Sequence, residues 1–324
     1  MRLSTVINGI AAAAITTLMA GAALAQQALE IIGQPVDGAM GFQPSATELK
    51  HDIVWLDTMI NYIIGAIVIF VTGLLLYTVV RFNRRSNPTP ARFTHNTPLE
   101  VVWTLLPIVI LVFIGAFSLP ILFKQQEIPV GDVTIKATGY QWYWGYEYVD
   151  EVKADGSSLS FESFLVDGAY KIDDEAAGWG DDQEMGTPMV LNEVAIKKLE
   201  YFGYTRDQFL LATDTAVVVP VGKNIVVQVT GADVIHSWKI PAFGVMQDAV
   251  PGRTAALWFN AEKEGIYFGQ CSELCGQAHA YMPITVKVVS EAAYAEWLTK
   301  AKAGDVQLSS AATEPAEVKV ASND

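Results

Sequence analysis

The chain has 324 residues, of which 51% are hydrophobic and 17% charged, and its formal net charge is −14. This acidic balance argues against a nucleic-acid partner, because an acidic surface repels phosphate backbones. The apolar content is high for a soluble protein and indicates that part of the chain lies in a membrane.

The first 25 residues have the features of a secretory signal peptide. Arg2 precedes an apolar, Ala-rich run, and the stretch GAALA ends in the small residues that signal peptidases require. We expect cleavage after Ala25, so that residues 26–58 form an exported N-terminal segment beginning at Gln26. An uncleaved anchor is the alternative, although the run is short for a spanning helix.

Two long stretches without charge follow, at residues 60–80 and 101–123. Each reaches the ~20 residues that a helix needs to cross a hydrocarbon core. They predict a transmembrane hairpin over residues 59–124, with the lipid bilayer as a partner. Two buried helices of a soluble domain are the less favoured interpretation.

The loop between these stretches is basic, whereas the segment before them is mostly acidic. It carries four arginines and one acidic residue, namely Arg81, Arg84, Arg85, Arg92 and Glu100. The positive-inside rule places this loop in the cytoplasm and both termini outside. We therefore expect a two-pass membrane protein with a large exported C-terminal domain.

Residues 125–303 have the composition of an exported β domain. Short β-branched and aromatic runs alternate with Gly, Pro and Asp, which predicts an antiparallel sandwich or barrel. One helix is expected at SEAAYAEWLTKAK, with Ser290 as its N-cap. Residues 304–324 have the composition of a disordered tail.

An acidic insertion interrupts this domain at about residues 150–200, with one short helix expected near LNEVAIKKLEYFG. Most of its carboxylates are expected to lie on a solvated surface. The negative field of the domain would also speed encounter with a basic partner, so a small cationic protein is the predicted partner.

Both cysteines of the chain lie in one short motif, GQCSELCGQAHAYMP. In an exported protein, Cys271 and Cys275 would ordinarily form a disulfide. Three further potential ligands change this balance: His279 and Met282 follow in the motif, and His236 ends an earlier predicted strand. Imidazole, thiolate and thioether together suit copper.

A blue-copper site uses one thiolate, whereas this motif offers two. Two thiolates can bridge a pair of copper ions, each capped by one histidine, while Met282 and the Glu273 carbonyl supply weak outer ligands. Zinc bound by the two cysteines and two histidines is the other metal interpretation.

The residues HSW, CSELCGQAHAYMP, QWYWGYEY, LLATDTAVVVP and DAVPGR, in this context of hairpin and β domain, resemble cytochrome c oxidase subunit II. The resemblance covers nearly all of the mature chain, and it implies a bacterial inner membrane with both termini in the periplasm. It implies a cupredoxin-like Greek-key domain and a dinuclear copper centre, CuA. The implied copper ligands are His236, Cys271, Glu273 through its carbonyl, Cys275, His279 and Met282. The Glu273 carboxylate would help to bind a magnesium ion shared with the haem-bearing subunit I.

The resemblance also implies a mechanism. Cytochrome c would dock on the acidic face, and the electron would enter at an exposed Trp142 and pass through the copper pair to haem in subunit I. There oxygen is reduced to water, coupled to proton pumping with further oxidase subunits. Tyr140 and Trp144, in the same run, are expected in the core. The acids expected around Trp142, each also explicable as an ordinary solvated carboxylate, are Glu147, Glu162, Asp214 and Asp233.

Glu100, at the start of the second helix, has two interpretations. It is a carboxylate favoured by the helix N-terminus, and the resemblance implies the mouth of a proton-uptake route. Three other functions remain as alternatives for the whole chain: a quinol oxidase subunit without copper, a copper carrier, and a structural domain with a disulfide.

Overall fold

The computed structural model describes residues 29–89 and 91–307. The expected signal peptide, residues 1–25, lies outside the described residues, as does most of the expected tail. The chain divides into a helical unit, residues 48–127, and a β unit formed by the flanking segments.

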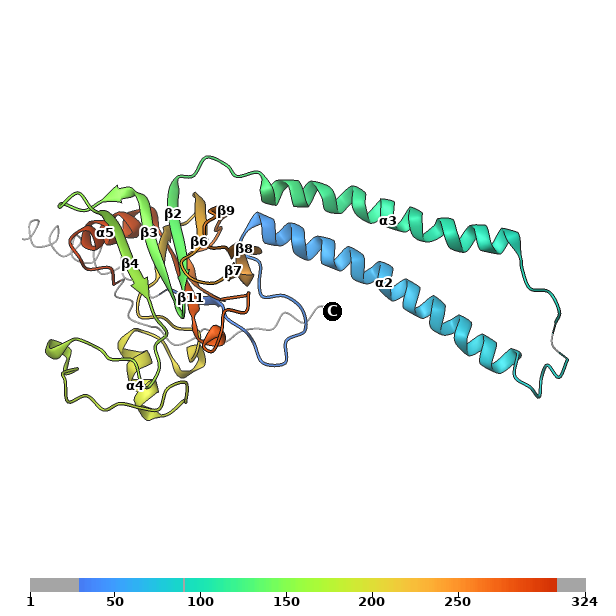
Figure 1. The fold of residues 1–324 in the computed structure, drawn as a ribbon, viewed down its shortest axis with the longest axis horizontal. Coiled ribbons are helices and arrows are strands. Elements are labelled where there is room, and N and C mark those ends of the chain that lie inside the picture. Colours follow the sequence, from blue (N-terminus) through green and yellow to red (C-terminus); the bar gives the residue numbers. More distant parts are fainter. Residues whose placement is uncertain (1–28, 90, 308–324) are drawn as a thin grey trace, which may run out of the picture. The chain divides into compact units, whose positions relative to one another are not determined.

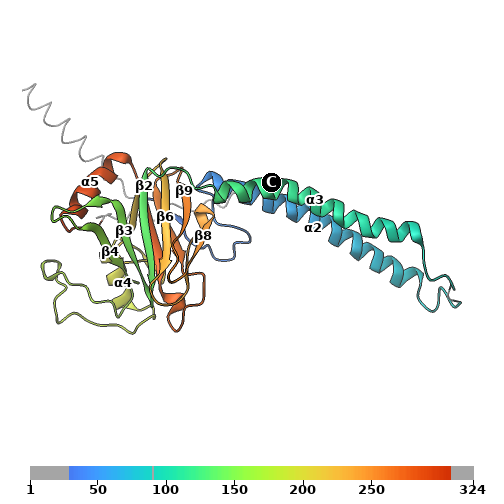
Figure 2. The same ribbon diagram turned by 45° about the horizontal axis from the view of Figure 1, so that its top comes forward.

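The helical unit is an antiparallel pair of long helices (Figures 1 and 2). They are α2, Glu48–Arg81, and α3, Thr97–Gln126, and both are long and apolar enough to cross a membrane. Both extend past the predicted stretches, since polar residues end an apolar run without ending a helix. Lys124 near the end of α3 contacts Glu48 at 2.6 Å and Asp52 at 2.7 Å in the first turns of α2.

The β unit contains two main sheets and a two-stranded ribbon. The five-stranded sheet runs in the order β4 (Ser158–Ser163), β3 (Tyr143–Val152), β2 (Val133–Tyr140), β6 (Asn224–Gly231) and β9 (Ala255–Asn260). The four-stranded sheet runs in the order β1 (Ile31–Gly33), β10 (Gly265–Gln270), β11 (Pro283–Val289) and β5 (Val217–Pro220). The ribbon pairs β7 (His236–Ile240) with β8 (Val245–Ala249).

Large aromatic side chains fill the core of this unit. Trp144, Trp238 and Phe259 are fully buried. Tyr148 of β3 donates its hydroxyl hydrogen to the Val218 carbonyl of β5 at 2.7 Å, which joins the two sheets. The predicted hairpin-plus-sandwich class is confirmed.

The two main sheets are mixed, whereas the sequence predicts an antiparallel sandwich or barrel. Strands β2 and β6, β11 and β5, and β1 and β10 pair in parallel. These partners are far apart in sequence, whereas turn residues report only the antiparallel pairing of neighbouring strands.

Helix α5, Glu291–Lys302, begins as expected, because the Ser290 hydroxyl oxygen accepts a hydrogen bond from the Ala293 amide at 3.2 Å. Helix α4, Glu193–Tyr201, is the short helix expected in the acidic insertion. Within residues 29–89 and 91–307, the remaining elements are single 3-10 turns at Glu175–Ala177, Arg206–Gln208, Pro241–Phe243 and His279–Tyr281.

The acidic insertion has an ordered interior as well as a charged surface. Lys198 of α4 is fully buried and donates to the carbonyl oxygens of Gly168 at 2.9 Å and Tyr170 at 2.6 Å. Buried Asp167 accepts the Met189 amide hydrogen at 2.8 Å. Lys198 therefore joins α4 to residues 168–170, and Asp167 joins the same part of the insertion to Met189.

Candidate metal centre

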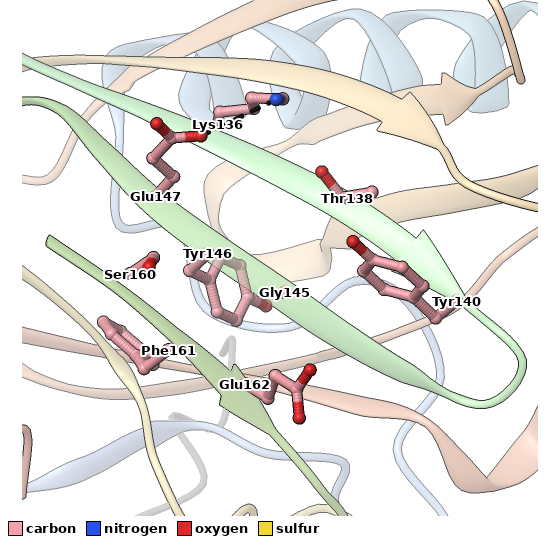
Figure 3. Close-up of a pocket in the computed structure, with 9 residues that line it drawn as sticks. All are labelled: Lys136, Thr138, Tyr140, Gly145, Tyr146, Glu147, Ser160, Phe161 and Glu162. Atoms are coloured by element: carbon pink, nitrogen blue, oxygen red, sulfur yellow. Dashed lines mark ion pairs between the residues drawn. The ribbon is translucent and has the colours of Figure 1, made fainter. Parts of the chain in front are cut away.

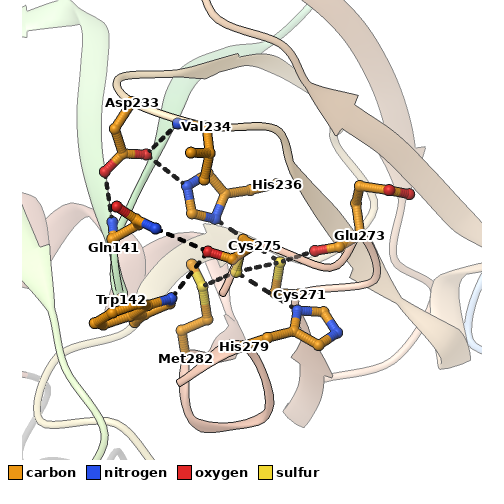
Figure 4. A network of polar contacts seen from close by, with 10 residues as sticks. All are labelled: Gln141, Trp142, Asp233, Val234, His236, Cys271, Glu273, Cys275, His279 and Met282. Atoms are coloured by element: carbon orange, nitrogen blue, oxygen red, sulfur yellow. Dashed lines mark hydrogen bonds and ion pairs between the residues drawn. The ribbon is translucent and has the colours of Figure 1, made fainter. Parts of the chain in front are cut away.

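The sulfur and imidazole groups of the motif lie close together, beside His236 (Figure 4). Residues 271–282 form the loop between β10 and β11, whose base is closed by the pairing of Gln270 with Pro283. His236 approaches from the first residue of β7. The antiparallel ladder therefore holds both ends of the loop and presents its ligands to His236.

The potential ligand atoms lie within a few ångströms of one another. The Sγ atoms of Cys271 and Cys275 are 3.8 Å apart. Cys271 Sγ is 3.9 Å from His236 Nδ1, and Cys275 Sγ is 3.5 Å from His279 Nδ1. Met282 Sδ lies 3.5 Å from Cys275 Sγ.

These spacings fit a metal bound between the groups. Two ligands that each lie about 2.0–2.3 Å from one metal, at a tetrahedral angle, are about 3.3–3.8 Å apart. The ligand atoms of His236, Cys271 and Cys275 all lie within 4.8 Å of one another, and all three residues are buried. The two Sγ atoms are much farther apart than the ~2.05 Å of a disulfide, and both cysteines are free.

His236 is completely buried, and each of its ring nitrogens faces a specific group. Nε2 lies 2.8 Å from Asp233 Oδ1, while Nδ1 faces Cys271. A hydrogen on Nε2 that bonds to this carboxylate leaves the Nδ1 lone pair directed toward the sulfur. A carboxylate behind a histidine in this way fixes the tautomer and orientation of a metal ligand.

The thiols influence each other's ionisation. Burial opposes a thiolate at Cys271, but contacts with His236 and with nearby donors outweigh burial and lower the pKa of Cys271. Burial and repulsion by Cys271 raise the pKa of Cys275. Burial also opposes a charged His236, yet Cys271 and Asp233 outweigh it and raise the pKa of this imidazole. Positive metal charge would remove the repulsion between two thiolates.

Glu273 has two separate groups at this site. Its backbone oxygen lies 3.3 Å from Cys271 Sγ, whereas its exposed carboxylate points away from the sulfurs (Figure 4). The carbonyl and the carboxylate of Glu273 therefore point in different directions.

Trp142 lies in the turn between β2 and β3, against the loop that carries the cysteines. Its indole N–H donates to the Cys275 carbonyl at 3.1 Å, and the residue, which was expected to be exposed, is only partly so. Trp144 is in the core as expected. Tyr140 is only half-buried, because it ends β2 and stacks on Tyr143 with ring centroids 4.8 Å apart.

Two of the expected docking acids line a surface hollow of about 370 Å³ on strands β2, β3 and β4 (Figure 3). Glu162 is exposed there, and the Oε2 atom of Glu147 lies 3.6 Å from Lys136 Nζ. Tyr140 closes the end of this hollow nearest to the β2–β3 turn.

The other two acids are engaged within the protein. Asp233 is partly exposed but bonds to His236, as described above. Asp214 is 9% exposed and accepts hydrogen bonds from the Phe164 amide at 2.7 Å and the Tyr170 hydroxyl at 2.8 Å. The expectation that Asp214 is part of a docking surface is corrected, because its carboxylate is used to hold the insertion.

Glu100 lies in the first turn of α3. Its carboxylate accepts the Asn96 amide hydrogen at 3.2 Å, and Asn96 in turn caps the helix by accepting from Leu99. The interpretation as a helix N-terminal carboxylate therefore agrees with the structure.

Several residues of the site have no signal in the sequence that marks them in advance. Gly139 makes room for the His236 ring, Gly276 lets the β2–β3 turn approach, and Gln141 bonds to the Cys275 carbonyl. Their roles arise from contacts between segments that are distant in the chain, which the sequence does not report.

Comparison with known proteins accounts for almost the whole chain. The family model for the periplasmic domain of cytochrome c oxidase subunit II matches residues 133–189 and 194–289, and the model for its transmembrane domain matches residues 35–121. Cytochrome c oxidase subunit 2 of Cereibacter sphaeroides is 61% identical over 311 residues, which are 96% of each chain. The chain belongs to the cytochrome c oxidase subunit II family.

Other relatives are more distant. The probable cytochrome c oxidase subunit 2 of Rickettsia bellii is 38% identical over 82% of this chain and 85% of its own length. The crystal structure of the periplasmic domain of subunit II (CoxB) of Bradyrhizobium japonicum is 41% identical, covers 55% of this chain and 98% of that chain, and has a TM-score of 0.39.

Membership of the cytochrome c oxidase subunit II family confirms the predicted activity. The protein is a subunit of a haem-copper terminal oxidase, and it is the subunit through which electrons enter. It is a two-pass membrane protein with a periplasmic-type β domain. The family implies a copper centre, and the cluster of His236, Cys271 and Cys275 is compatible with one.

Proposed function

We propose that this subunit II chain binds a dinuclear copper centre and accepts electrons there from cytochrome c. The proposed ligands are His236, Cys271, the Glu273 carbonyl, Cys275, His279 and Met282. The observation that carries this proposal is the placement of two free sulfurs 3.8 Å apart, each facing one imidazole nitrogen. Held by these residues, a pair of copper ions would supply one-electron transfer with little change in geometry.

Copper is favoured over zinc by the donor set. A structural zinc site is complete with four ligands and has no use for a thioether. Here the buried Met282 sulfur lies 3.5 Å from Cys275 Sγ. Soft sulfur ligands combined with imidazole suit copper.

Trp142 is the residue through which we propose that the electron enters. It is half-buried, and its indole N–H reaches the peptide group of Cys275 directly. The exposed Glu162, together with Glu147 and Asp233, gives the nearby surface the negative charge that a basic cytochrome c requires. Asp214 is left out of this proposal because it is buried.

The remaining roles follow from the family resemblance. We propose that the Glu273 carboxylate helps to bind magnesium at the boundary with subunit I, and that Glu100 lies at a proton-uptake route. Both termini are proposed to lie in the periplasm of a bacterial inner membrane, after removal of residues 1–25. The arginines after α2 support this orientation.

The rival functions make different demands on these residues. A quinol oxidase subunit needs no copper ligands, and a copper carrier needs ligands that release metal readily. The buried cysteines and His236, and the close contact of Trp142 with Cys275, fit fixed metal and electron uptake.

Electron uptake is tested by mixing reduced cytochrome c rapidly with the purified oxidase. Replacing Trp142 by Phe is expected to slow reduction of the copper centre by about tenfold or more, with copper content unchanged. Trp179→Phe, in the acidic insertion, is the matched control and should behave as the wild type. Equal rates for Trp142→Phe and wild type would contradict this route.

A further inference from the structure

The backbone carbonyl of Cys275 accepts two hydrogen bonds from one turn. The side-chain amide of Gln141 donates at 3.0 Å, and the indole of Trp142 donates at 3.1 Å (Figure 4). Both donors come from the two residues that join β2 to β3. The carbonyl therefore has both of its lone pairs engaged, which restricts rotation of the peptide group that follows the Cys275 sulfur.

Gln141 also reaches the opposite side of the cluster through its backbone. Its amide donates to Asp233 Oδ2 at 2.8 Å, while Asp233 Oδ1 contacts His236 Nε2 at 2.8 Å. The same Oδ1 accepts the Val234 amide hydrogen at 2.7 Å. One residue thus connects the segment that carries His236 with the loop that carries Cys275.

The next residue of the loop is shaped for this approach. Gly276 has φ +119°, and a Cβ atom there would lie 3.2 Å from Gln141 Nε2 and 3.1 Å from Trp142 Cζ2. A side chain at residue 276 would press on both donors, and an L residue would be strained in this backbone conformation. The loop and the turn are therefore fitted to each other at this point.

Packing in the core does not explain why residue 141 has a side-chain amide. Gln141 is exposed, so its side chain fills no space in the core. An exposed glutamine can satisfy its amide with water and keep its rotamer freedom. Here the side chain is instead directed at the carbonyl of a proposed copper ligand.

We propose that Gln141 is a positioning residue for the metal centre of this oxidase subunit. Its side chain fixes the Cys275 peptide jointly with Trp142, and its backbone fixes Asp233 behind His236. The consequence is a constant arrangement of the Cys275 and His236 sides of the centre and of Trp142 against it. This inference rests on the proposed copper site and adds a residue that binds no metal.

Gln141→Met tests the role of the amide, because methionine matches glutamine in length and shape but has no donor. Gln277→Met is the matched control, since Gln277 is exposed in the same loop and, among the described residues, makes no hydrogen bond through its side chain. Both variants are prepared in the whole oxidase. The measurements are copper content, the absorption and spin-resonance spectra of the centre, its reduction potential, and the rate of reduction by cytochrome c.

We expect Gln141→Met to retain copper but to show altered spectra, a shifted potential and slower reduction, while Gln277→Met matches the wild type. A readout independent of copper is hydrogen exchange in the metal-free chain. The backbone amides of residues 276–281 should exchange about fivefold faster in Gln141→Met, the effect of one net hydrogen bond.

Wild-type spectra, potential and exchange rates in Gln141→Met would overturn the inference, because a side chain of equal shape would then suffice. If Gln141→Met fails to assemble, Gln141→Lys is tested in its place, because lysine restores a hydrogen-bond donor on a side chain of similar length. Assembly of the lysine variant supports the inference, and failure of both variants overturns it. Absence of copper from the wild-type oxidase would instead contradict the proposed function.

Discussion

Gly139 in strand β2 lies directly against the imidazole of His236. A Cβ atom at residue 139 would stand 2.8 Å from the Cγ and Cδ2 atoms of the ring, closer than real side-chain contacts. The Gly139 carbonyl also accepts the Ala232 amide hydrogen at 2.9 Å, which holds the segment before His236 against β2. The position of this proposed ligand therefore depends on a neighbour that has no side chain.

Gly139→Ala should displace the His236 ring and weaken copper binding while the β unit remains folded. The variant chain is purified in detergent, and its copper content and melting temperature are compared with those of the wild type. Gly180→Ala is the control, because a Cβ atom there meets nothing within 4 Å. Full copper content in Gly139→Ala would show that His236 is not held as the structure indicates.

Asp233→Asn should lower copper affinity by about 10- to 100-fold, the usual effect of changing the group behind a metal-binding histidine. An asparagine cannot accept from both His236 and the Gln141 amide, because one of its two terminal atoms is a donor. Affinity is measured by competition with a copper chelator. Asp181→Asn changes a surface ion pair with Lys171 and should have no effect. An unchanged affinity in Asp233→Asn would contradict this role.

Lys287 in β11 gives a prediction about pH. Burial lowers the pKa of Lys287 from 10.5 to about 8. The folded chain then binds fewer protons than the unfolded chain between these values, so this group makes stability rise with pH from about 8 to 10.5. Below about pH 8 the cost in stability is constant, on the order of 3 kcal/mol.

Comparison with Lys287→Met isolates this group from the tyrosines that also titrate. The methionine variant should be more stable than the wild type at pH 7, and the gap in free energy of unfolding should narrow as pH rises to 10.5. Chemical unfolding followed by tryptophan fluorescence measures the gap. A gap that stays constant from pH 7 to 10.5 would contradict the lowered pKa.

Glu162 and Asp214 were both expected on the docking surface, but only Glu162 is exposed. Their variants should therefore differ in how the KM for cytochrome c depends on salt. Glu162→Gln should raise KM for cytochrome c at low ionic strength, with the difference shrinking at high salt as screening grows. Asp214→Asn should instead lower stability by about 1–3 kcal/mol, because a buried acceptor pair is disturbed, and leave the salt dependence of KM unchanged. A salt-dependent KM change in Asp214→Asn but not in Glu162→Gln would contradict this assignment.

The features that the sequence predicts correctly are those with local signals. A charge-free stretch of spanning length identifies each membrane helix, and Ser290 marks the start of α5. The ligand cluster could be predicted because four of its side chains lie in one loop, where Cys271 and Met282 adjoin paired strands. Only His236 had to be added from a distant segment.

The features that could not be predicted depend on contacts between segments far apart in the chain. Parallel pairing of β2 with β6 is set by packing, and no turn residue reports it. Asp214 has the same composition signal as an exposed acid, yet the Tyr170 hydroxyl holds it inside. Nothing in the sequence distinguishes Gln141 from other polar residues, because its contact with the Cys275 carbonyl joins segments far apart in the chain.

The most direct test of the central claim is the metal content and spin-resonance spectrum of the purified chain. The account predicts two copper ions per chain and, in the oxidised form, one unpaired electron shared equally between two copper nuclei, with a strong visible absorption from the bridging thiolates. Replacement of Cys275 by Ser should abolish the shared-electron signal, whereas Ser272→Ala should preserve it. A chain that binds no copper and contains a bond between Cys271 and Cys275 would contradict the account.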